Sequence, residues 1–287
     1  MPELPEVETI KNELSPRLVG QSFTQVTVYD ADLLPDSSIE EFRHKLIGQM
    51  IESLERRGKH LIFNLSNRAL IMHFRMTGFL LLNPKGIGRY ARAVFRFSNG
   101  TQVVFKDQRR FGVMWLAEDV DTVLGKLGPE PLAGSFTPGI LAQRLSRRHI
   151  PIKAALIDQS VIAGIGNMYA DEALFAARIH PLRKANTLSL KEMQTLYHCI
   201  REVLWSAIES KGASVDTYIR PEGQLGTAQF AFKVAHRGGE PCPICGTRIQ
   251  RILVRNRGTC FCPKCQVCAL PQQRIFPSSF DSPSCWL

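Results

Sequence analysis

The first eight residues of the chain could supply an amine nucleophile together with acid–base partners. They read Met1-Pro2-Glu3-Leu4-Pro5-Glu6-Val7-Glu8. If Met1 is removed, Pro2 becomes a free secondary amine with the carboxylates of Glu3 and Glu6 near it in sequence. A secondary amine that attacks a sugar carbon or a carbonyl forms directly an iminium (Schiff-base) cation, which has no N–H proton left to lose and so stays charged. The alternative is structural, because proline suits the first turn of a helix and acidic residues there favour the helix dipole.

Four cysteines near the carboxyl end of the chain have the spacing of a metal site. Two Cys-x2-Cys pairs are separated by sixteen residues, and the four thiols are those of Cys242, Cys245, Cys262 and Cys265. This is the pattern of a zinc ribbon, in which four thiolates hold one Zn²⁺ and leave no open coordination position. The zinc is therefore expected to be structural. Cys260 and Cys268 leave the ligand choice partly open, because Cys265 and Cys268 form a further Cys-x2-Cys pair.

The charge balance indicates a polyanionic partner. The 287 residues include 36 Lys and Arg against 26 Asp and Glu, which gives a formal charge of +10. Such a balance favours nucleic acid. The hairpin between the cysteine pairs carries four arginines that could meet a phosphate backbone, Arg248, Arg251, Arg255 and Arg257.

No apolar run is long enough to span a bilayer and no signal peptide is found, so we expect a cytoplasmic protein that does not bind membranes.

The first 130 residues are expected to form a β-sandwich or flattened barrel preceded by a helix. Val7, Ile10 and Leu14 recur at helical spacing, and a second short helix should follow Ser37, which has capping-box spacing with Glu40. Alternating or short apolar runs predict seven strands, and Asn99-Gly100 predicts a two-residue hairpin turn. The expected strands are residues 24–29, 50–54, 60–65, 69–74, 93–97, 102–105 and 113–116.

A Gly- and Pro-rich break at residues 127–135 separates this part from a helical one. Helical spacing predicts helices over residues 139–146, 153–158, 168–177 and 190–211. The chain is thus expected to be an α+β protein of several domains. The expected divisions are a catalytic β-sandwich at 1–131, a linker with a first helix at 132–150, a helical domain at 151–236, the zinc ribbon at 237–268 and a disordered tail at 269–287.

Seven segments, in this order along the chain, together resemble those of formamidopyrimidine-DNA glycosylases, bacterial enzymes that remove oxidised purines from DNA. The segments are the N-terminal Pro-Glu run, Arg57-Gly58-Lys59, Met76-Thr77-Gly78, residues 107–112 (Asp-Gln-Arg-Arg-Phe-Gly), residues 127–132 (Leu-Gly-Pro-Glu-Pro-Leu), residues 164–172 (Gly-Ile-Gly-Asn-Met-Tyr-Ala-Asp-Glu) and the zinc ribbon. The helical domain resembles the helix-two-turns-helix module of this family, with a loop that caps the lesion.

The resemblance implies a role for each matching residue. Pro2 would attack C1′ of the damaged nucleotide, Glu3 would assist ring opening and proton transfer, Glu6 would support the site, and Lys59 would hold phosphates and aid the chemistry. The Schiff base would then lead to elimination of the 3′ and 5′ phosphates. Met76, Arg109 and Phe111 match the residues that fill the gap left by the flipped base. Positions that contact phosphates are matched by His73, Lys153, Asn167 and Arg257, and we count Arg257 with the catalytic residues. The implied partner is double-stranded DNA with oxidised bases, bound by a monomer.

Two stretches depart from the family pattern. Members often carry Tyr-Gly-Arg shortly before the first cysteine pair, where the tyrosine touches DNA phosphate, and this chain has Ala235-His236-Arg237. His236 could substitute, or one contact could be lost. The stretch His73-Phe74-Arg75-Met76 replaces the more usual Leu-Gly between the histidine and the methionine, which adds a positive charge near the gap-filling loop.

Two other functions compete with this interpretation. Endonuclease VIII enzymes use the same nucleophile and ribbon but prefer oxidised pyrimidines. Leu4 and Val7, where that group has Gly and Ile, and the long loop at residues 212–234 favour the purine enzyme. The second alternative is a non-catalytic zinc-ribbon protein that binds DNA and leaves its N-terminal amine idle. Covalent trapping through Pro2 would separate these classes.

Overall fold

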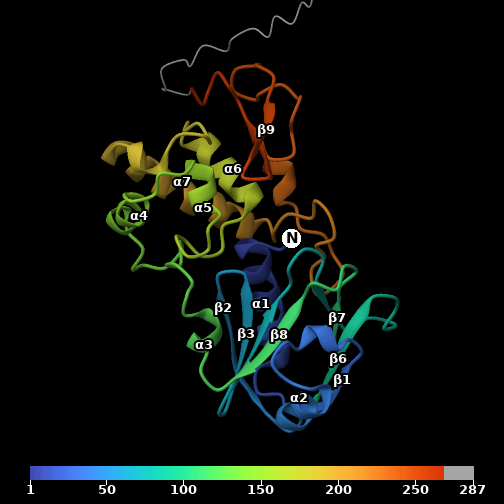
Figure 1. The fold of residues 1–287 in the computed structure, drawn as a ribbon. Coiled ribbons are helices and arrows are strands. Elements are labelled where there is room, and N and C mark those ends of the chain that lie inside the picture. Colours follow the sequence, from blue (N-terminus) through green and yellow to red (C-terminus); the bar gives the residue numbers. More distant parts are fainter. Residues whose placement is uncertain (268–287) are drawn as a thin grey trace, which may run out of the picture.

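Eight strands in the first half of the chain form two four-stranded antiparallel sheets. This computed structural model describes residues 1–267, so the tail expected at 269–287 lies outside the described residues. The sheet orders are β1-β6-β7-β5 and β2-β3-β4-β8. Their strands are β1 (Phe23–Val28), β2 (Ile51–Arg57), β3 (His60–Leu65), β4 (Ala69–His73), β5 (Phe79–Leu82), β6 (Ala91–Phe97), β7 (Gln102–Lys106) and β8 (Val113–Ala117). Apolar side chains of both sheets share one buried core, which confirms the expected β-sandwich (Figure 1).

Three local predictions in this half were wrong. Strand β5 was not predicted, because its four residues are a short apolar run without alternation. The turn between β6 and β7 has three residues and not two, since Phe97 N donates to Thr101 O and only Gly100, at φ 79°, takes a left-handed conformation. Helix α2 (Ile39–Leu46) is capped one residue later than expected, where Ser38 Oγ accepts from Glu41 N.

The first helix, α1 (Leu4–Leu18), packs into both halves of the molecule. Leu4 lies in the core of the helical half. Val7, Ile10 and Leu14 lie in the core of the sandwich. Figure 1 shows α1 between the sheets below and the helices above, with the N-terminus at the junction of the two halves. The start of α1 is therefore held by both cores at once.

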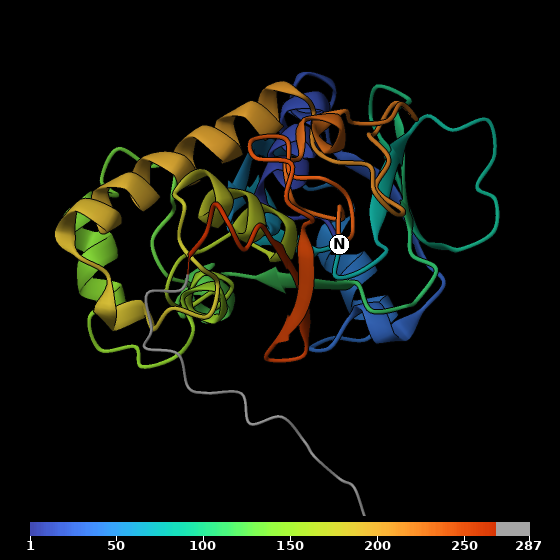
Figure 2. The same ribbon diagram turned by 90° about the horizontal axis from the view of Figure 1, so that it is seen from above.

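Four further helices build the second half within the described residues, and they are α4 (Pro138–Leu145), α5 (Ile152–Leu156), α6 (Asn167–Ala176) and α7 (Leu190–Glu209). Helix α7 packs along α6 and α4, and Figure 2 shows it as the long helix crossing this half. It begins at a capping box, in which Ser189 Oγ accepts from Glu192 N. The first half also contains two short helices, α2 (Ile39–Leu46) and α3 (Asp121–Leu124). Three 3-10 turns are η1 (Ala31–Leu33), η2 (Ala185–Thr187) and η3 (Ala228–Ala231). Among residues 1–267 no helix has the length and apolar character needed to cross a bilayer.

The last two strands of the described residues, β9 (Gln250–Val254) and β10 (Arg257–Phe261), form a two-stranded hairpin. Its two turn residues, Arg255 and Asn256, both have positive φ, as a tight two-residue hairpin turn requires. Figure 2 shows this hairpin next to the N-terminus. The tip of the ribbon and the first residue of the chain are thus brought to one place.

Candidate active site and zinc centre

The N-terminus lies where two cavities meet. One cavity, of about 260 Å³, is lined by the starts of α1 and α6, the loop after α7 and the ribbon tip. The other, of about 590 Å³, is lined mainly by loops of the sandwich. Met1, Met76 and Arg257 line both. Pro2 lies buried directly behind Met1, so removal of Met1 would free the Pro2 nitrogen at the junction of the two cavities.

The carboxylate of Glu3 caps the N-terminus of helix α6. Its Oε2 accepts from Gly166 N at 2.7 Å, and its Oε1 accepts from Met168 N at 3.2 Å. The anion at this helix start is thus the protein's own Glu3. Free N–H groups and the helix dipole both stabilise a negative charge there. The carboxylate is consequently fixed beside Pro2.

The two glycines before α6 let the start of α1 approach closely. A Cβ on Gly166 would lie 2.3 Å from Glu3 Cδ, and one on Gly164 would lie 2.6 Å from Leu4 Cδ1. Gly164 also has φ +90°, which favours glycine, and its carbonyl accepts from Leu4 N at 3.1 Å. The Gly-x-Gly-Asn motif is therefore a docking turn for the N-terminal residues.

Gly166→Ala should damage both stability and activity. The added methyl group would overlap a buried carboxylate that is held by two N–H donors, so we expect the free energy of unfolding to fall by about 3 kcal/mol and the cleavage rate to fall with it. Urea unfolding and single-turnover cleavage measure the two effects. Gly134→Ala is the matched control, because a Cβ at Gly134 meets nothing within 4 Å. Equal stability of the two variants would contradict this close approach.

Glu6 is a fully buried carboxylate that ties α1 to the helical half. It accepts hydrogen bonds from Tyr169 Oη, from Ala213 N at 2.8 Å and from Glu3 N at 2.8 Å. Burial, reinforced by the negative charge of Glu3, raises the pKa of Glu6. The family resemblance implies a supporting role for Glu6 but does not indicate its partner Tyr169, although this residue lies inside the 164–172 segment. Glu6 thus holds Glu3 and the start of the 212–234 loop in place.

Lys59 lies at the tip of a two-residue hairpin between β2 and β3. The pairing of Arg57 with His60 closes this hairpin. Lys59 makes no ion pair with any residue in 1–267, although it is buried near the acidic groups of the N-terminus. Burial lowers the pKa of Lys59, and the charges of Glu3 and Glu6 oppose this shift. An amine in this setting gives up its proton more readily than an exposed lysine.

Glu130 of the 127–132 segment anchors the Lys59 hairpin. Its carboxylate accepts from Gly58 N and from Arg57 Nη1 at 3.0 Å, and it pairs with Arg56 Nη2 at 2.8 Å. Arg57 Nη2 also donates to Gly128 O at 2.6 Å. These contacts join the linker between the two halves to the hairpin that carries Lys59. The sequence analysis matched both segments but did not predict that they touch.

A buried aspartate shapes the loop expected to fill the gap left by a flipped base. Asp107 accepts from Thr77 Oγ1, from Arg109 N at 3.1 Å, from Phe111 N at 2.9 Å and from Gly112 N at 2.7 Å. Phe111 is 49% exposed, and the Arg109 guanidinium lies 4.7 Å from its ring centroid. Phe111 and Met76 line the larger cavity with Met1. The loop therefore presents an exposed aromatic ring and a cation next to the N-terminus.

Of the four residues matched to phosphate contacts, the structure places Arg257 and Asn167 at the cavities. Arg257 is exposed and lines both, and Asn167 Nδ2 donates to Gly258 O at 2.9 Å. Lys153 departs from the expectation. It has no exposed surface, and its Nζ pairs with Asp171 Oδ1 at 2.6 Å. In this structure the charge of Lys153 joins α5 and α6, and its Nζ also donates to Gly258 O on the ribbon at 3.2 Å.

His73, the fourth matched residue, is half-buried against His60, with ring centroids 4.6 Å apart. Its Nδ1 accepts from Arg75 N at 3.0 Å. Burial lowers the pKa of His73 well below its usual value, and the nearby His60 and Arg75 add to the effect. A phosphate contact by His73 would therefore be made by a neutral imidazole.

His60 should make the protein less stable in mild acid. Burial lowers the pKa of His60 to about 4 from the ordinary 6.5. Between these values the unfolded chain binds a proton that the folded chain does not, so the free energy of unfolding falls as the pH drops from 6.5 toward 4. We expect a loss of about 2 kcal/mol over that window. Urea unfolding at several pH values should show this slope reduced in His60→Gln and unchanged in His44→Gln, whose histidine is exposed on α2. An unchanged slope in His60→Gln would contradict the assignment.

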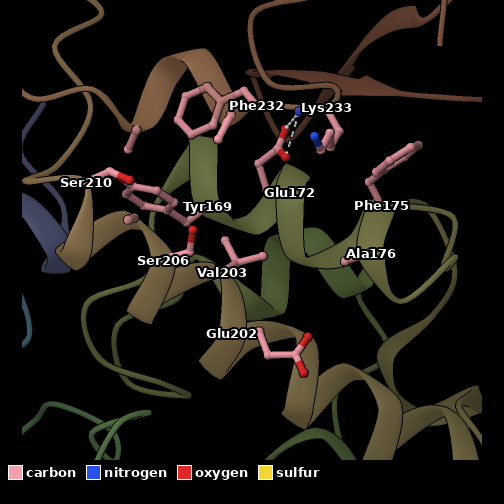
Figure 3. Close-up of a pocket in the computed structure, with 13 residues that line it drawn as sticks. Tyr169, Glu172, Phe175, Ala176, Glu202, Val203, Ser206, Ser210, Phe232 and Lys233 are labelled. Carbon is pink, nitrogen blue, oxygen red and sulfur yellow. Dashed lines mark hydrogen bonds between the residues drawn. The ribbon is translucent and has the colours of Figure 1, made fainter. Parts of the chain in front are cut away.

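Helix α6 also positions the ribbon through two buried acids. Asp171 Oδ2 accepts from Cys260 N at 3.0 Å. The Glu172 carboxylate accepts from the backbone N–H groups of Lys233, Val234 and Ala235 at 2.7–3.0 Å. Figure 3 shows Glu172 reaching from α6 to the backbone of Lys233. Helix α6 thus holds Glu3 at its first turn and the segment 233–235, which precedes the ribbon, at its second turn.

The four cysteines expected to bind zinc lie together, with all Sγ atoms within 4.8 Å of one another. Sγ separations such as 3.8 Å for Cys242–Cys265 and 3.5 Å for Cys245–Cys262 suit the edges of a tetrahedral thiolate site. Cys260 is buried outside this set, and Cys268 lies outside the described residues. The donor chemistry fits one structural Zn²⁺ held by the four predicted ligands.

Comparisons with known proteins agree with this geometry. Three family models match the chain: "Formamidopyrimidine-DNA glycosylase N-terminal domain" at residues 1–114, "Formamidopyrimidine-DNA glycosylase H2TH domain" at 127–218 and "Zinc finger found in FPG and IleRS" at 239–267. The formamidopyrimidine-DNA glycosylase of Symbiobacterium thermophilum is 44% identical over 272 residues, which cover 93% of this chain and 89% of the relative. That of Chloroflexus aurantiacus is 43% identical and is covered to 98%.

Solved structures give the same result. The MutM (Fpg) protein from Thermus thermophilus has a TM-score of 0.85 and 39% identity, with 92% of this chain and 98% of that chain covered. The Lactococcus lactis Fpg, solved in complex with DNA that contains an abasic site, has a TM-score of 0.85 and 36% identity, with 92% and 99% covered. The resemblance inferred from the sequence is confirmed, and the chain belongs to the formamidopyrimidine-DNA glycosylase family.

Proposed function

We propose that this enzyme excises oxidised purines, 8-oxoguanine and formamidopyrimidines, from double-stranded DNA and then cuts the backbone at the resulting abasic site. The observation that carries the proposal is the position of Pro2, buried behind Met1 at the meeting point of two cavities with the Glu3 carboxylate fixed beside it. Lactococcus lactis Fpg has been solved with DNA that contains Fapy-dG or an abasic site. These are a substrate and an intermediate of the reaction proposed for this chain.

The reaction begins when the free amine of Pro2 attacks C1′ of the damaged nucleotide. The bond from C1′ to the base breaks, the base leaves with its electron pair, and opening of the sugar ring gives the iminium cation. Glu3 lies close enough to serve the proton transfers at the ring oxygen and at the sugar. The cation then acidifies the adjacent sugar protons, so that elimination expels first the 3′ phosphate and then the 5′ phosphate and leaves a one-nucleotide gap. Hydrolysis of the remaining iminium returns the free amine.

Lys59 and Glu6 complete the proposed catalytic group. Lys59 is unpaired within residues 1–267 and has a lowered pKa, so its amine can bind a phosphate or pass on a proton. Glu6 acts through others, since its carboxylate accepts from Glu3 N and Tyr169 Oη. It is therefore a positioning residue in this proposal.

The exposed side chains around the cavities are assigned to DNA. Met76, Arg109 and Phe111 would enter the space left by the flipped base, while His73, Asn167 and Arg257 would contact phosphates. We propose that the protein acts as a monomer on DNA in the cytoplasm. The sandwich at 1–131 would carry the nucleophile, and the helical part at 151–236 and the ribbon at 237–268 would grip the duplex.

The choice of lesion is tested by excision from otherwise identical duplexes. We expect faster release of 8-oxoguanine than of thymine glycol under single-turnover conditions. A preference for thymine glycol would point instead to the endonuclease VIII activity. Binding without release of either base would indicate a DNA-binding protein with an idle amine.

Arg257→Ala should weaken binding to every DNA sequence. Arg257 is an exposed cation at the cavity junction, and removal of one phosphate contact lowers the slope of log K against log salt by about 0.9. The affinity for a lesion duplex should fall by about tenfold. Titrations at several KCl concentrations measure both quantities. Arg43→Ala is the control, because Arg43 is exposed on α2, at the end of the sandwich away from the N-terminus (Figure 1). An unchanged salt slope for Arg257→Ala would remove the ribbon tip from the DNA interface.

A further inference from the structure

A groove lined mainly by apolar side chains lies between α6, α7 and η3. It has a volume of about 360 Å³, and Phe175, Ala176, Val203 and Phe232 form much of its wall (Figure 3). None of its lining residues lines either cavity at the N-terminus. The groove is therefore separate from the candidate active site, and the proposed reaction makes no use of it.

Two exposed charges flank this groove. Figure 3 shows Glu202 of α7 at one end and Lys233, which follows η3, at the other, with apolar side chains between them. Neither residue forms an ion pair within residues 1–267. The other acid in the lining, Glu172, is buried and already accepts from three backbone N–H groups. A ligand that fits this groove has an apolar centre with a positive group at one end and a negative group at the other.

The sequence beyond residue 267 contains such a segment. Residues 274–281 read Arg-Ile-Phe-Pro-Ser-Ser-Phe-Asp. Arg274 and Asp281 are the only charged residues in 268–287, and three bulky apolar side chains lie between them. A segment that has no structure of its own can fold onto a surface that buries its apolar side chains. The order of side chains in this segment is complementary to the order found along the groove.

The chain leaves the ribbon close to the groove. Gln266 is buried, and its Nε2 donates to Ile179 O at 2.9 Å. Ile179 comes three residues after the end of α6, and the last turn of this helix lines the groove with Phe175 and Ala176. The seven residues from 268 to 274 can span about 24 Å, which is about four turns of helix. Residue 274 can therefore reach the groove of its own molecule.

We propose that residues 274–281 dock into this groove of the same molecule, with Arg274 at Glu202 and Asp281 at Lys233. Burial of the apolar side chains between the two charges would drive the docking, and the two ion pairs would fix its direction. Helix α7 and η3 lie near the two ends of the 212–234 loop, so a docked segment would brace both ends of this loop. The inference goes beyond the proposed function, in which residues 274–281 take no part.

Photo-crosslinking in the full chain tests the docking. Phe276 is replaced by the photoreactive residue p-benzoylphenylalanine, and peptide mass spectrometry after irradiation locates the bond that it forms. We expect cross-links within one chain to peptides of α7 or of residues 228–233. The same probe in place of Tyr29, which is exposed at the end of β1 in the sandwich, should form no bond with these peptides.

Charge reversal tests whether the cross-link depends on the proposed contacts. Glu202→Lys and Arg274→Glu should each lower the cross-link yield about threefold. The double variant should restore the yield, because it rebuilds the ion pair with its charges exchanged. Glu209→Lys is the matched control, since Glu209 is exposed on the same helix and does not line the groove. Circular dichroism checks that each variant is folded.

Three results would overturn the inference. Cross-links between two chains would place the segment on another copy, and cross-links confined to other surfaces would leave the groove without this occupant. Equal yields in Glu202→Lys and Glu209→Lys would show that the charge at the groove has no role. These measurements contain no DNA, so an enzyme that fails to form a borohydride-trapped adduct would defeat the proposed function and leave this result intact.

Discussion

Pro2→Gly should cut an 8-oxoguanine duplex on the order of 10³-fold more slowly than the parent enzyme, because the proposed nucleophile is the ring nitrogen of proline. A Schiff base formed by a glycine amine keeps an N–H and can lose this proton to become a neutral imine, which acidifies the adjacent sugar protons less than a permanent cation does. Glycine also lacks the ring that restrains the terminal nitrogen. Single-turnover cleavage at saturating enzyme isolates this chemical step from DNA binding. The Kd for a duplex with an abasic analogue should change much less than the rate.

Pro5→Ala is the control for this variant. Pro5 lies in the first turn of α1, is buried, and takes no part in the proposed chemistry. It tests whether damage to the start of the helix alone slows cleavage. Comparable losses in the two variants, or an unaltered rate for Pro2→Gly, would show that the terminal nitrogen is not the nucleophile.

Removal of zinc should lower the affinity for lesion DNA by about a hundredfold or more while the β-sandwich stays folded. The ribbon core is small and consists mainly of the cysteines with Phe175, Val234 and Ile249. It cannot hold the β9–β10 hairpin without the metal. Arg257 and Gly258 at the hairpin start would then lose their positions against the N-terminus and Asn167. After chelation, a zinc-binding dye assay measures the zinc that is released. Near-UV circular dichroism shows whether the β-sandwich stays folded, and DNA titration measures the loss of affinity.

The cysteines distinguish this expectation from a general effect of thiol loss. Cys262→Ser should reduce zinc below one ion per chain and reproduce the loss of affinity. Cys260→Ser should retain one zinc, since Cys260 lies outside the four-thiol cluster. Full DNA affinity in a chain shown to be free of zinc would contradict the structural role of the metal.

Most of the secondary structure was predictable because local patterns decide it. Helix α7 begins at a capping box, and strands such as β3 alternate or run apolar between clear turns. Strand β5 was missed because a run of four apolar residues has no period of its own and becomes a strand only through pairing with β7. The turn at Gly100 was misjudged by one residue, since its length depends on the pairing of Phe97 with Thr101.

The candidate site was predictable in its residues but not in its contacts. The sequence singled out both Glu3 and the Gly-x-Gly turn, yet nothing local indicates that a carboxylate caps a helix 163 residues away. Lys153 was assigned to phosphate because it matches a phosphate-contacting position of the family, and its ion pair with the buried Asp171 one turn into α6 could not be predicted from the sequence. Tyr169, Asp107, Glu130 and Glu172 gave no signal beyond their place in the motifs. Their roles depend on side chains brought together by tertiary packing.

The most direct test of the account is borohydride trapping of the enzyme on an 8-oxoguanine duplex, followed by peptide mass spectrometry. Reduction should fix the Schiff base, and the account predicts a single adduct on a peptide that begins at Pro2, with the sugar remnant on its terminal nitrogen. An adduct on Lys59, an adduct-free protein that still cuts the duplex, or a fully active chain that retains Met1 would contradict it.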